Sequence, residues 1–321
     1  MTLPTALQLS RFPDALEDEL AARLTLVRWS DLDGQAQAAF LATRADEVSI
    51  VITSGHLGCP PELMRALPAL ALVAINGVGF DQVDLGLARE RGVAVSNTPD
   101  VLTEDVADLA VGLVIALLRR LPAADAHVRS GAWEKGSFPW ARKVSGRRFG
   151  VLGLGRIGAA IADRLAAFGP VAYNARTDKD NGRRFFADPH DLAAWADVLV
   201  VACAATAETH GMADARMLAA LGPSGWLVNV SRGSVVDEAA LVAALEAGGI
   251  AGAALDVFAQ EPQVPAPLRE SGRTVLAPHI GSATHETRQA MGELVVANVD
   301  AFLAGNALVT PVAQGAPVLG R

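Results

Sequence analysis

Short hydrophobic runs rich in Val, Leu and Ile recur along the chain, and stretches with helical spacing of apolar residues separate them. In the first part this pattern predicts strands at 6–10, 24–29, 48–53, 71–75 and 93–96, with helices at 14–23, 35–42, 61–66 and 83–91. Strands that alternate with helices are typical of an open parallel sheet, because parallel strands need a long crossover connection.

A second alternating series of strands and helices begins near residue 148. Its predicted strands are 148–152, 171–174, 198–202, 226–230, 251–255 and 274–277, with helices between them. Arg183 and Arg184 are expected in a solvated loop after the second of these strands. The chain therefore holds two similar α/β series rather than one.

Two longer helices are predicted at about 104–121 and at 284–303. Thr103 can cap the first of them, and Pro122 is expected to end it. The segment 123–144 holds two tryptophans, a proline and several charges, and we expect an extended arm there rather than a regular element.

The fold class that fits this pattern is α/β, with two doubly wound parallel-sheet domains and a cleft between them. We expect a discontinuous domain of residues 1–99 and 284–321, and a second domain of residues 100–283 with an arm at about 122–147. Ligands in such sheets bind outside the carboxyl ends of the strands, so the cleft is the expected site.

The composition narrows the classes of function. Acidic residues outnumber basic ones, 35 to 27, and a net charge of −8 without a basic stripe argues against nucleic-acid binding. The two cysteines exclude a disulfide framework, and no Cys/His spacing suits a metal. The start of the chain does not resemble a signal peptide, and no apolar run is long enough for a membrane span. We therefore expect a cytoplasmic protein with no metal, no membrane partner and no nucleic-acid partner.

A nucleotide-binding motif follows the strand predicted at 148–152. Gly153, Gly155 and Gly158 have the GxGxxG spacing and open a predicted helix with an apolar face. The first glycine permits the tight turn, the second lets the backbone approach a pyrophosphate, and the third lets helix and strand pack closely. The sequence therefore predicts a dinucleotide site at this turn.

The end of the next strand indicates which dinucleotide is preferred. No acid stands there to bind the ribose hydroxyls; instead Asn174, Arg176 and Thr177 follow the strand. Arginine can pair with a 2′-phosphate, Asn and Thr can donate to it, and a carboxylate would repel it. NADP, with NADPH preferred over NADH, is therefore the predicted cofactor. Asp178 comes too late to bind the ribose and is expected to face water.

Four ordered motifs in the chain resemble those of the D-isomer-specific 2-hydroxyacid dehydrogenases, in particular the glyoxylate/hydroxypyruvate reductase branch. They are VLGLGRIG at 151–158, NVSRGSVVDE at 229–238, LDVFAQEP at 255–262 and APHIGSAT at 277–284. NGVGFD at 76–81 is similar to the glycine turn of the family's substrate domain. The resemblance implies a Rossmann cofactor domain at 100–283 and a flavodoxin-like substrate domain, and it extends from about residue 50 to the end.

Three residues in these motifs are the candidate catalytic groups. Arg232 can bind a carboxylate bidentately and polarise a keto oxygen. His279 can give a proton to the developing alkoxide as a general acid. Glu261 is its expected partner, because a nearby carboxylate favours the imidazolium and orients the ring.

The resemblance also implies further contacts. Besides the glycines and the residues after the second strand, the cofactor contacts it implies are Arg156, Ile157, Cys203, Thr209, Val230, Asp256, Gly281 and Val106. The substrate contacts are Leu57, Gly58, Gly77, Val78 and Gly79, together with Arg232, His279 and Trp140 of the arm. Ala204 departs from the family, which usually has proline there; this puts only a local loop shape in doubt.

The leading interpretation is an NADPH-dependent reductase of glyoxylate and hydroxypyruvate that forms D-hydroxy acids where C2 is chiral. A hydroxyphenylpyruvate-type aryl-pyruvate reductase on the same scaffold is the alternative, and a dinucleotide-sensing binding protein is the non-enzymatic one. A homodimer is expected from the family and from the arm, whose Trp140 could enter the pocket of a second subunit. Cys59 and Cys203 are expected to be buried small hydrophobes rather than nucleophiles.

Overall fold

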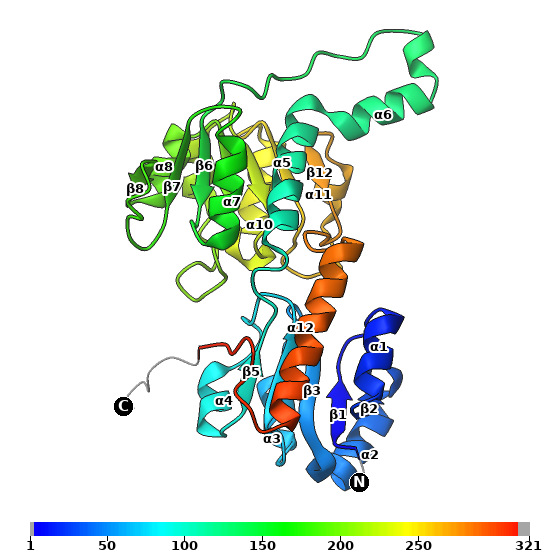
Figure 1. Ribbon diagram of the computed structural model, residues 1–321. Helices are drawn as coiled ribbons and strands as arrows, with labels where there is room; N and C mark the ends of the chain where they lie inside the picture. Colours follow the sequence, from blue (N-terminus) through cyan, green and yellow to red (C-terminus); the bar gives the residue numbers. More distant parts are fainter. Residues whose placement is uncertain (1–2, 314–321) are drawn as a thin grey trace. The chain divides into compact units, whose positions relative to one another are not determined.

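The computed structural model describes residues 3–313 of the 321-residue chain. The chain divides into two compact units, and every strand pairing in both sheets is parallel (Figure 1). The first unit comprises residues up to Leu102 and those from His285 onward, and the second comprises Thr103–Thr284. The predicted fold class of two parallel-sheet α/β units is thus confirmed.

The first unit is built on a sheet in the order β2-β1-β3-β4-β5, which is the flavodoxin-like arrangement. Its strands are β1 (Thr5–Gln8), β2 (Thr25–Arg28), β3 (Val48–Ser54), β4 (Leu72–Asn76) and β5 (Ala94–Ser96). Its helices are α1 (Asp14–Ala21), α2 (Gly34–Arg44), α3 (Pro61–Ala66), α4 (Leu85–Glu90) and α12 (His285–Leu303), with 3₁₀ turns at Trp29–Asp31 and Ala45–Glu47.

Alternate side chains of these strands pack into two apolar layers. Ile50 of β3 packs in one layer with helices α1 and α12, whereas Val51 packs in the other with α2, α3 and α4. Because both faces of the sheet are covered, the strands are apolar on both sides. The chain after α12 returns to the sheet, where the Val312 N–H donates to the Val95 carbonyl at 2.8 Å.

The second unit is built on a larger sheet in the order β12-β11-β10-β9-β6-β7-β8. The order reverses beside its first strand, β6, as in the Rossmann fold. Its strands are β6 (Phe149–Leu152), β7 (Val171–Asn174), β8 (Arg184–Phe186), β9 (Val198–Val201), β10 (Trp226–Asn229), β11 (Gly252–Leu255) and β12 (Thr274–Leu276). Its helices are α5 (Thr103–Arg119), α6 (Leu121–Arg129), α7 (Arg156–Leu165), α8 (Pro189–Trp195), α9 (Ala215–Leu221), α10 (Glu238–Glu246) and α11 (Ala266–Glu270), with 3₁₀ turns at Ala132–Glu134 and Gly233–Val235.

Two local expectations about the second unit are wrong. Helix α5 ends at Arg119, and Pro122 lies in the first turn of a new helix, α6, because a proline at that position leaves no N–H unsatisfied. The arm therefore contains a helix and a 3₁₀ turn instead of being wholly extended. Arg184 begins strand β8, which pairs with β7, rather than lying in a loop; three residues are too short a run to show a strand period.

No helix within residues 3–313 is long and apolar enough to cross a membrane.

Candidate active site

The glycine turn after β6 is shaped by backbone packing. Gly153 has a φ of +95°, and a Cβ there would lie 2.4 Å from the Cα of Cys203. A Cβ at Gly158, in the first turn of α7, would lie 2.0 Å from the Gly153 carbonyl oxygen. Gly155, which caps α7, has nothing within 4 Å of its Cβ position. The turn is therefore closed on the protein side and open at Gly155, beside the exposed Arg156 and the half-buried Ile157.

Of the residues at and after the end of β7, one is hydrogen-bonded within the fold and others are exposed on the surface. The side-chain amide of Asn174 donates to the carbonyls of Phe186 (2.8 Å) and Ala187 (3.1 Å), so both its hydrogens are engaged within the fold rather than offered to a phosphate. Arg176 and Thr177 are exposed. Asp178 is exposed as expected, but its carboxylate does not simply face water, because it accepts a hydrogen bond from the hydroxyl of Tyr173 at 2.5 Å.

Side-chain hydrogen bonds hold the loop after β9 and join it to the end of β10. The hydroxyl of Ser231 donates to the carbonyl of Cys203, and the hydroxyl of Thr209 donates to the carbonyl of Ala204 at 2.7 Å. Val230 is buried directly after β10. The loop at Ala204, where proline was expected, is thus held by Thr209 instead.

Arg232 lies in a loop whose shape is fixed on both sides. Asn229 donates from its amide to the Arg232 carbonyl at 3.0 Å, and the guanidinium donates to the Ser231 carbonyl at 2.9 Å. Any side chain on the following Gly233 would overlap Phe258, since a Cβ would lie 1.9 Å from its carbonyl carbon. This contact packs the Arg232 loop against the segment that carries Glu261.

His279 and Glu261 form a hydrogen-bonded pair. Their Nδ1 and Oε2 atoms are 2.6 Å apart, and the other carboxylate oxygen of Glu261 accepts from the Phe258 N–H at 3.0 Å. Both side chains are partly exposed, at 34% for the histidine and 23% for the glutamate. A carboxylate acceptor places a hydrogen on Nδ1, so proton exchange with a ligand would take place at Nε2.

Asp256 holds the backbone on which His279 stands. Its buried carboxylate accepts from the N–H groups of Ile280 (2.8 Å) and Gly281 (2.9 Å), and its carbonyl accepts from the His279 N–H at 2.9 Å. Burial raises the pKa of Asp256 above its ordinary value, against the lowering effect of the two N–H donors. A Cβ at Gly281 would lie 3.3 Å from Val106 of α5, so the structure brings Asp256, Gly281 and Val106 together.

These groups share one edge of the second sheet. Gly153, Cys203, Arg232, Asp256 and His279 follow β6, β9, β10, β11 and β12 in turn, and parallel strands present their carboxyl ends at the same edge. The sequence motifs therefore converge on a single site in this unit.

In the first unit two turns pack against each other after β3 and β4. A Cβ at Gly77 would lie 3.1 Å from the backbone nitrogen of Gly55. Gly58, with a φ of +57°, lies against Gln82, whose carbonyl oxygen would be 2.3 Å from a Cβ, and Leu57 beside it is 42% exposed. Val78 and Gly79 complete the second turn.

The turn at Gly77, Val78 and Gly79 is held by residues that sequence reasoning missed. The amide of Asn97 donates to the Val78 carbonyl at 2.8 Å, and the Thr98 N–H donates to the Gly77 carbonyl at 2.9 Å. Asn97 and Thr98 follow β5 directly, and an Asn-Thr pair at a strand end was the only signal in the sequence.

Trp140 lies on the exposed arm of the second unit. Its side chain is 99% exposed, and Trp133 is 65% exposed. Within the second unit alone, Trp140 is therefore not brought to the edge that carries His279.

The two thiols are not poised as nucleophiles. Burial raises the pKa of Cys59 to about 12 and that of Cys203 to about 11. Neither thiol is ionised near neutral pH, and nucleophilic attack requires the thiolate. Among residues 3–313, no group of three or more His, Cys, Asp or Glu side chains is arranged to hold a metal ion.

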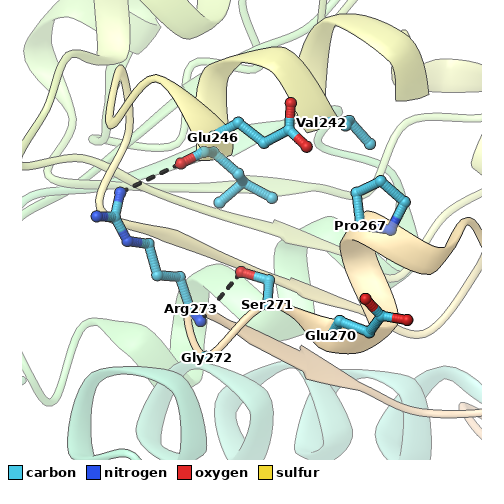
Figure 2. A pocket seen from close by; sticks show the side chains of 8 residues that line it. Val242, Glu246, Pro267, Glu270, Ser271, Gly272 and Arg273 are labelled. Carbon is cyan, nitrogen blue, oxygen red and sulfur yellow. Dashed lines mark hydrogen bonds between the residues drawn. The ribbon is translucent and has the colours of Figure 1, made fainter.

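A separate cavity of about 580 Å³ lies between α10, α11 and the start of β12 (Figure 2). Arg273 donates from its guanidinium to the Leu245 carbonyl at 3.2 Å, and Glu246 and Glu270 also line the cavity. Arg273 precedes β12, so this cavity lies at the amino-terminal edge of the sheet, opposite the edge of His279. None of the predicted site residues lines it.

Comparisons with known proteins agree with this arrangement. The family model of the D-isomer specific 2-hydroxyacid dehydrogenase NAD binding domain matches residues 111–281. A glyoxylate/hydroxypyruvate reductase A from Arabidopsis thaliana and a hydroxyphenylpyruvate reductase from Plectranthus scutellarioides are each 47% identical over 300 residues, which covers 92% of this chain and 95% of the relative. A solved structure of an NADPH-dependent glyoxylate/hydroxypyruvate reductase from Sinorhizobium meliloti, in complex with NADP and malonate, is 43% identical with a TM-score of 0.92 and covers 98% of both chains. The chain belongs to the D-isomer-specific 2-hydroxyacid dehydrogenase family.

Proposed function

We propose that this chain catalyses the NADPH-dependent reduction of small 2-keto acids, such as glyoxylate and hydroxypyruvate, to 2-hydroxy acids with D configuration where C2 is chiral. The observation that carries the proposal is the His279–Glu261 pair, 2.6 Å apart, at the same sheet edge as Arg232 and the glycine turn. This edge supplies an acid, a carboxylate anchor and a nucleotide turn within one unit.

The glycine turn fits a dinucleotide. The space around Gly155 lets a pyrophosphate approach the backbone, and the N–H groups at the start of α7 point their partial positive charge toward it. Arg156 and Ile157 would line the pyrophosphate. Cys203 and Thr209 would flank the adenosine, and Val230, Asp256 and Gly281 would hold the ribose and nicotinamide. When bound, the dinucleotide supplies a hydride to C2 of the keto acid.

The chain's own residues perform the rest of the reaction. Arg232 binds the substrate carboxylate and polarises the keto oxygen through its planar guanidinium. The Nε2 proton of His279 passes to the oxygen on C2, which leaves a neutral imidazole and a hydroxy acid. Glu261 holds the ring by Nδ1 and so orients Nε2 toward the substrate. The N–H groups of the turn at Gly77, Val78 and Gly79 are proposed to bind the same carboxylate.

The preference for NADPH rests on the residues after β7. Arg176 and Thr177 are exposed there, and Asn174 is engaged within the fold, so the first two would bind a 2′-phosphate. The Sinorhizobium meliloti reductase, named as NADPH-dependent and solved with NADP, supports this choice.

The second candidate is reduction of an aryl pyruvate. The Plectranthus scutellarioides hydroxyphenylpyruvate reductase is as similar to this chain as the Arabidopsis thaliana glyoxylate/hydroxypyruvate reductase. The same catalytic groups would serve, and only the space around the C3 substituent would differ.

The test is the rate of reduced-nicotinamide oxidation by the purified protein. NADPH and NADH are each combined with glyoxylate, hydroxypyruvate, pyruvate and hydroxyphenylpyruvate. Fast NADPH oxidation with the small acids is expected. A preference for hydroxyphenylpyruvate would move the substrate class, and a preference for NADH would overturn the cofactor assignment. Tight nucleotide binding without turnover would favour a dinucleotide sensor.

Two substitutions test the catalytic roles. His279→Gln should lower kcat at least about a hundredfold, the usual contribution of a general acid, while dinucleotide affinity stays the same. The matched control is His190→Gln, because His190 lies in the first turn of α8 with its ring beside Asp188 and is not itself a candidate site residue. Arg232→Lys should raise KM and lower kcat together, since a point charge does not replace the planar fork.

We further propose that the protein is a homodimer that buries the arm. Four large apolar side chains of the arm are exposed, Leu121 (48%), Val128 (54%), Trp133 (65%) and Trp140 (99%). Exposed aromatic side chains of this size are typical of interfaces, and Trp140 would contribute to the pocket of the second subunit. Sedimentation of the wild type as a dimer and of Trp133→Ser/Trp140→Ser as a monomer would support this, and a monomeric wild type would exclude it.

A further inference from the structure

Tyr173 is the only tyrosine of the chain, and it is fully buried in β7. Its ring packs against Phe185 of β8, with 5.5 Å between ring centroids. Its hydroxyl donates to Oδ1 of Asp178 at 2.5 Å and accepts from the Lys179 N–H at 2.7 Å. The Tyr173 hydroxyl therefore connects the buried core of the sheet to the loop that follows β7.

The same carboxylate oxygen also organises the loop itself. Oδ1 of Asp178 accepts from the N–H of Asp180 at 3.0 Å, and Asp180 has a φ of +46°. This is a local turn in which an aspartate replaces a backbone acceptor. The Tyr173 hydroxyl anchors this turn to the buried ring.

Arg176 and Thr177 lie between two such anchors. Before them, Asn174 is bonded to the carbonyls of Phe186 and Ala187; after them, Asp178 is bonded to Tyr173. A short segment fixed at both ends has few conformations left to lose when a ligand binds. The two exposed residues that would meet a 2′-phosphate are thus carried on a preorganised loop.

The electrostatics of Asp178 would otherwise oppose phosphate binding. The Tyr173 hydroxyl and the Asp180 N–H hold the pKa of Asp178 below its ordinary value, so the carboxylate is ionised at neutral pH. Burial and the bond to Asp178 raise the pKa of Tyr173, so its hydroxyl keeps the proton that it donates. A carboxylate this close to Arg176 in sequence could pair with the guanidinium or repel a phosphate. The Tyr173 hydroxyl and the Asp180 N–H instead hold this carboxylate by hydrogen bonds to its Oδ1.

We propose that Tyr173 and Asp178 are positioning residues for cofactor selectivity, a latch that holds the loop after β7 in the form in which Arg176 and Thr177 receive the 2′-phosphate of NADPH. This inference rests on the proposed NADPH preference and adds to it the residues that set the loop. Tyr173 touches neither cofactor nor substrate; it acts through Asp178.

The central experiment is Tyr173→Phe, which removes the hydroxyl and keeps the packed ring. Dissociation constants are measured for NADPH and NADH and for the fragments 2′,5′-ADP and 5′-ADP. The expected result is an increase of about tenfold in the dissociation constants of NADPH and 2′,5′-ADP, the usual loss for a hydrogen bond to a charged group. Those of NADH and 5′-ADP should change less than about twofold, and kcat at saturating NADPH should stay the same, since the latch does not touch the reacting atoms.

Variants at Asp178 separate positioning from charge. Asp178→Ala removes the acceptor and should raise the dissociation constant of 2′,5′-ADP as much as Tyr173→Phe does. Asp178→Asn keeps an oxygen that accepts from the Tyr173 hydroxyl. Its dissociation constant for 2′,5′-ADP should therefore stay within about threefold of the wild-type value. Combining Tyr173→Phe with Asp178→Ala should add nothing to either, because both remove the same bond. Asp178 is exposed, so these variants test the proposal even where Tyr173→Phe folds poorly.

Each other outcome overturns a defined part. A wild type that binds 2′,5′-ADP no better than 5′-ADP contradicts the proposed NADPH preference itself. A wild type that prefers 2′,5′-ADP, with Tyr173→Phe and Asp178→Ala unchanged, contradicts the latch alone. Equal weakening of NADPH and NADH in Tyr173→Phe shows general disruption of the unit, and tighter 2′,5′-ADP binding by Asp178→Ala shows that Asp178 acts only by charge.

Discussion

Two glycine turns, one in each unit, each follow an inner strand of a parallel sheet, yet different forces hold them. The turn after β6 is fixed by backbone packing, since side chains at Gly153 and Gly158 would meet backbone atoms at 2.4 and 2.0 Å. The turn after β4 is packed less tightly, since a Cβ at Gly77 would lie 3.1 Å from the Gly55 nitrogen, and its carbonyls accept hydrogen bonds from the Asn97 amide and the Thr98 N–H. The turn after β6 depends on the absence of side chains at its glycines, and the turn after β4 depends on hydrogen bonds that Asn97 and Thr98 donate.

This difference determines how each turn would fail. A turn held by close packing tolerates almost no added volume, because backbone atoms cannot move aside as a side chain can. A turn held by hydrogen bonds loses them one at a time, at about 1 kcal/mol each. Substitutions of Gly153 or Gly158 should therefore act as all-or-none changes, and substitutions around the substrate turn should act in graded steps.

The largest effect is expected from Gly158→Ala. The new methyl group would overlap the Gly153 carbonyl oxygen, and the free energy of unfolding should fall by about 3 kcal/mol or more. Dinucleotide binding should be lost with it. Urea denaturation followed by fluorescence measures the first quantity, and a variant as stable as the wild type would refute the packing account.

Gly155→Ala should separate binding from stability. Gly155 has a φ of −80° and no atom within 4 Å of its Cβ position, so alanine fits there without strain. The melting temperature should therefore stay the same. The methyl group would occupy the space of the pyrophosphate, and the dissociation constant for NADPH should rise about tenfold or more. Unchanged affinity would mean that the backbone at Gly155 does not approach the cofactor.

The same contrast explains what the sequence could predict. The turn at Gly153, Gly155 and Gly158 could be predicted from the glycine spacing together with the strand before it and the helix after it, because the residues that form this turn are contiguous in the sequence. The strands at 171–174 and 48–53 were foreseen nearly to the residue, since buried parallel strands are apolar runs. The role of Asn97 could not be predicted, because its hydrogen bond joins segments whose proximity only the folded sheet creates. The hydrogen bond of Tyr173 is local, since Asp178 is five residues further on, but only the turn after β7 brings that carboxylate back to the hydroxyl.

Helix α6 and strand β8 show a second limit of sequence reasoning. The sequence pattern predicts that Pro122 ends a helix, but proline is equally suited to the first turn of the next one. Strand β8 has only three residues, and its pairing with β7 gives it its conformation. The local sequence pattern does not predict secondary structure where tertiary contacts determine it.

Asn97→Ala should produce the first graded step at the substrate turn. It removes the bond to the Val78 carbonyl, so KM for the keto acid should rise about fivefold, which corresponds to about 1 kcal/mol. The dissociation constant for NADPH should stay the same, because Asn97 belongs to the other unit. Asn306→Ala, at an exposed asparagine beyond α12, is the control. An equal loss of NADPH affinity would show that the two turns do not act separately.

The smallest effect is expected one step farther away, at Thr310. Its hydroxyl donates to the Asn97 carbonyl at 2.6 Å and accepts from the Asn298 amide of α12 at 2.8 Å, while its N–H donates to the Asn298 side-chain oxygen at 3.0 Å. Thr310→Val removes only the hydroxyl bonds and keeps the shape of the side chain. KM for the keto acid should rise about twofold, since Asn97 loses support but keeps its own bond to Val78. Thr310→Ser should restore the wild-type value because it restores the hydroxyl. A lower melting temperature with an unchanged KM would show that the hydrogen-bonded support of the substrate turn ends at Asn97. A KM as high as that of Asn97→Ala would show instead that the segment after α12 positions this turn as strongly as Asn97 does.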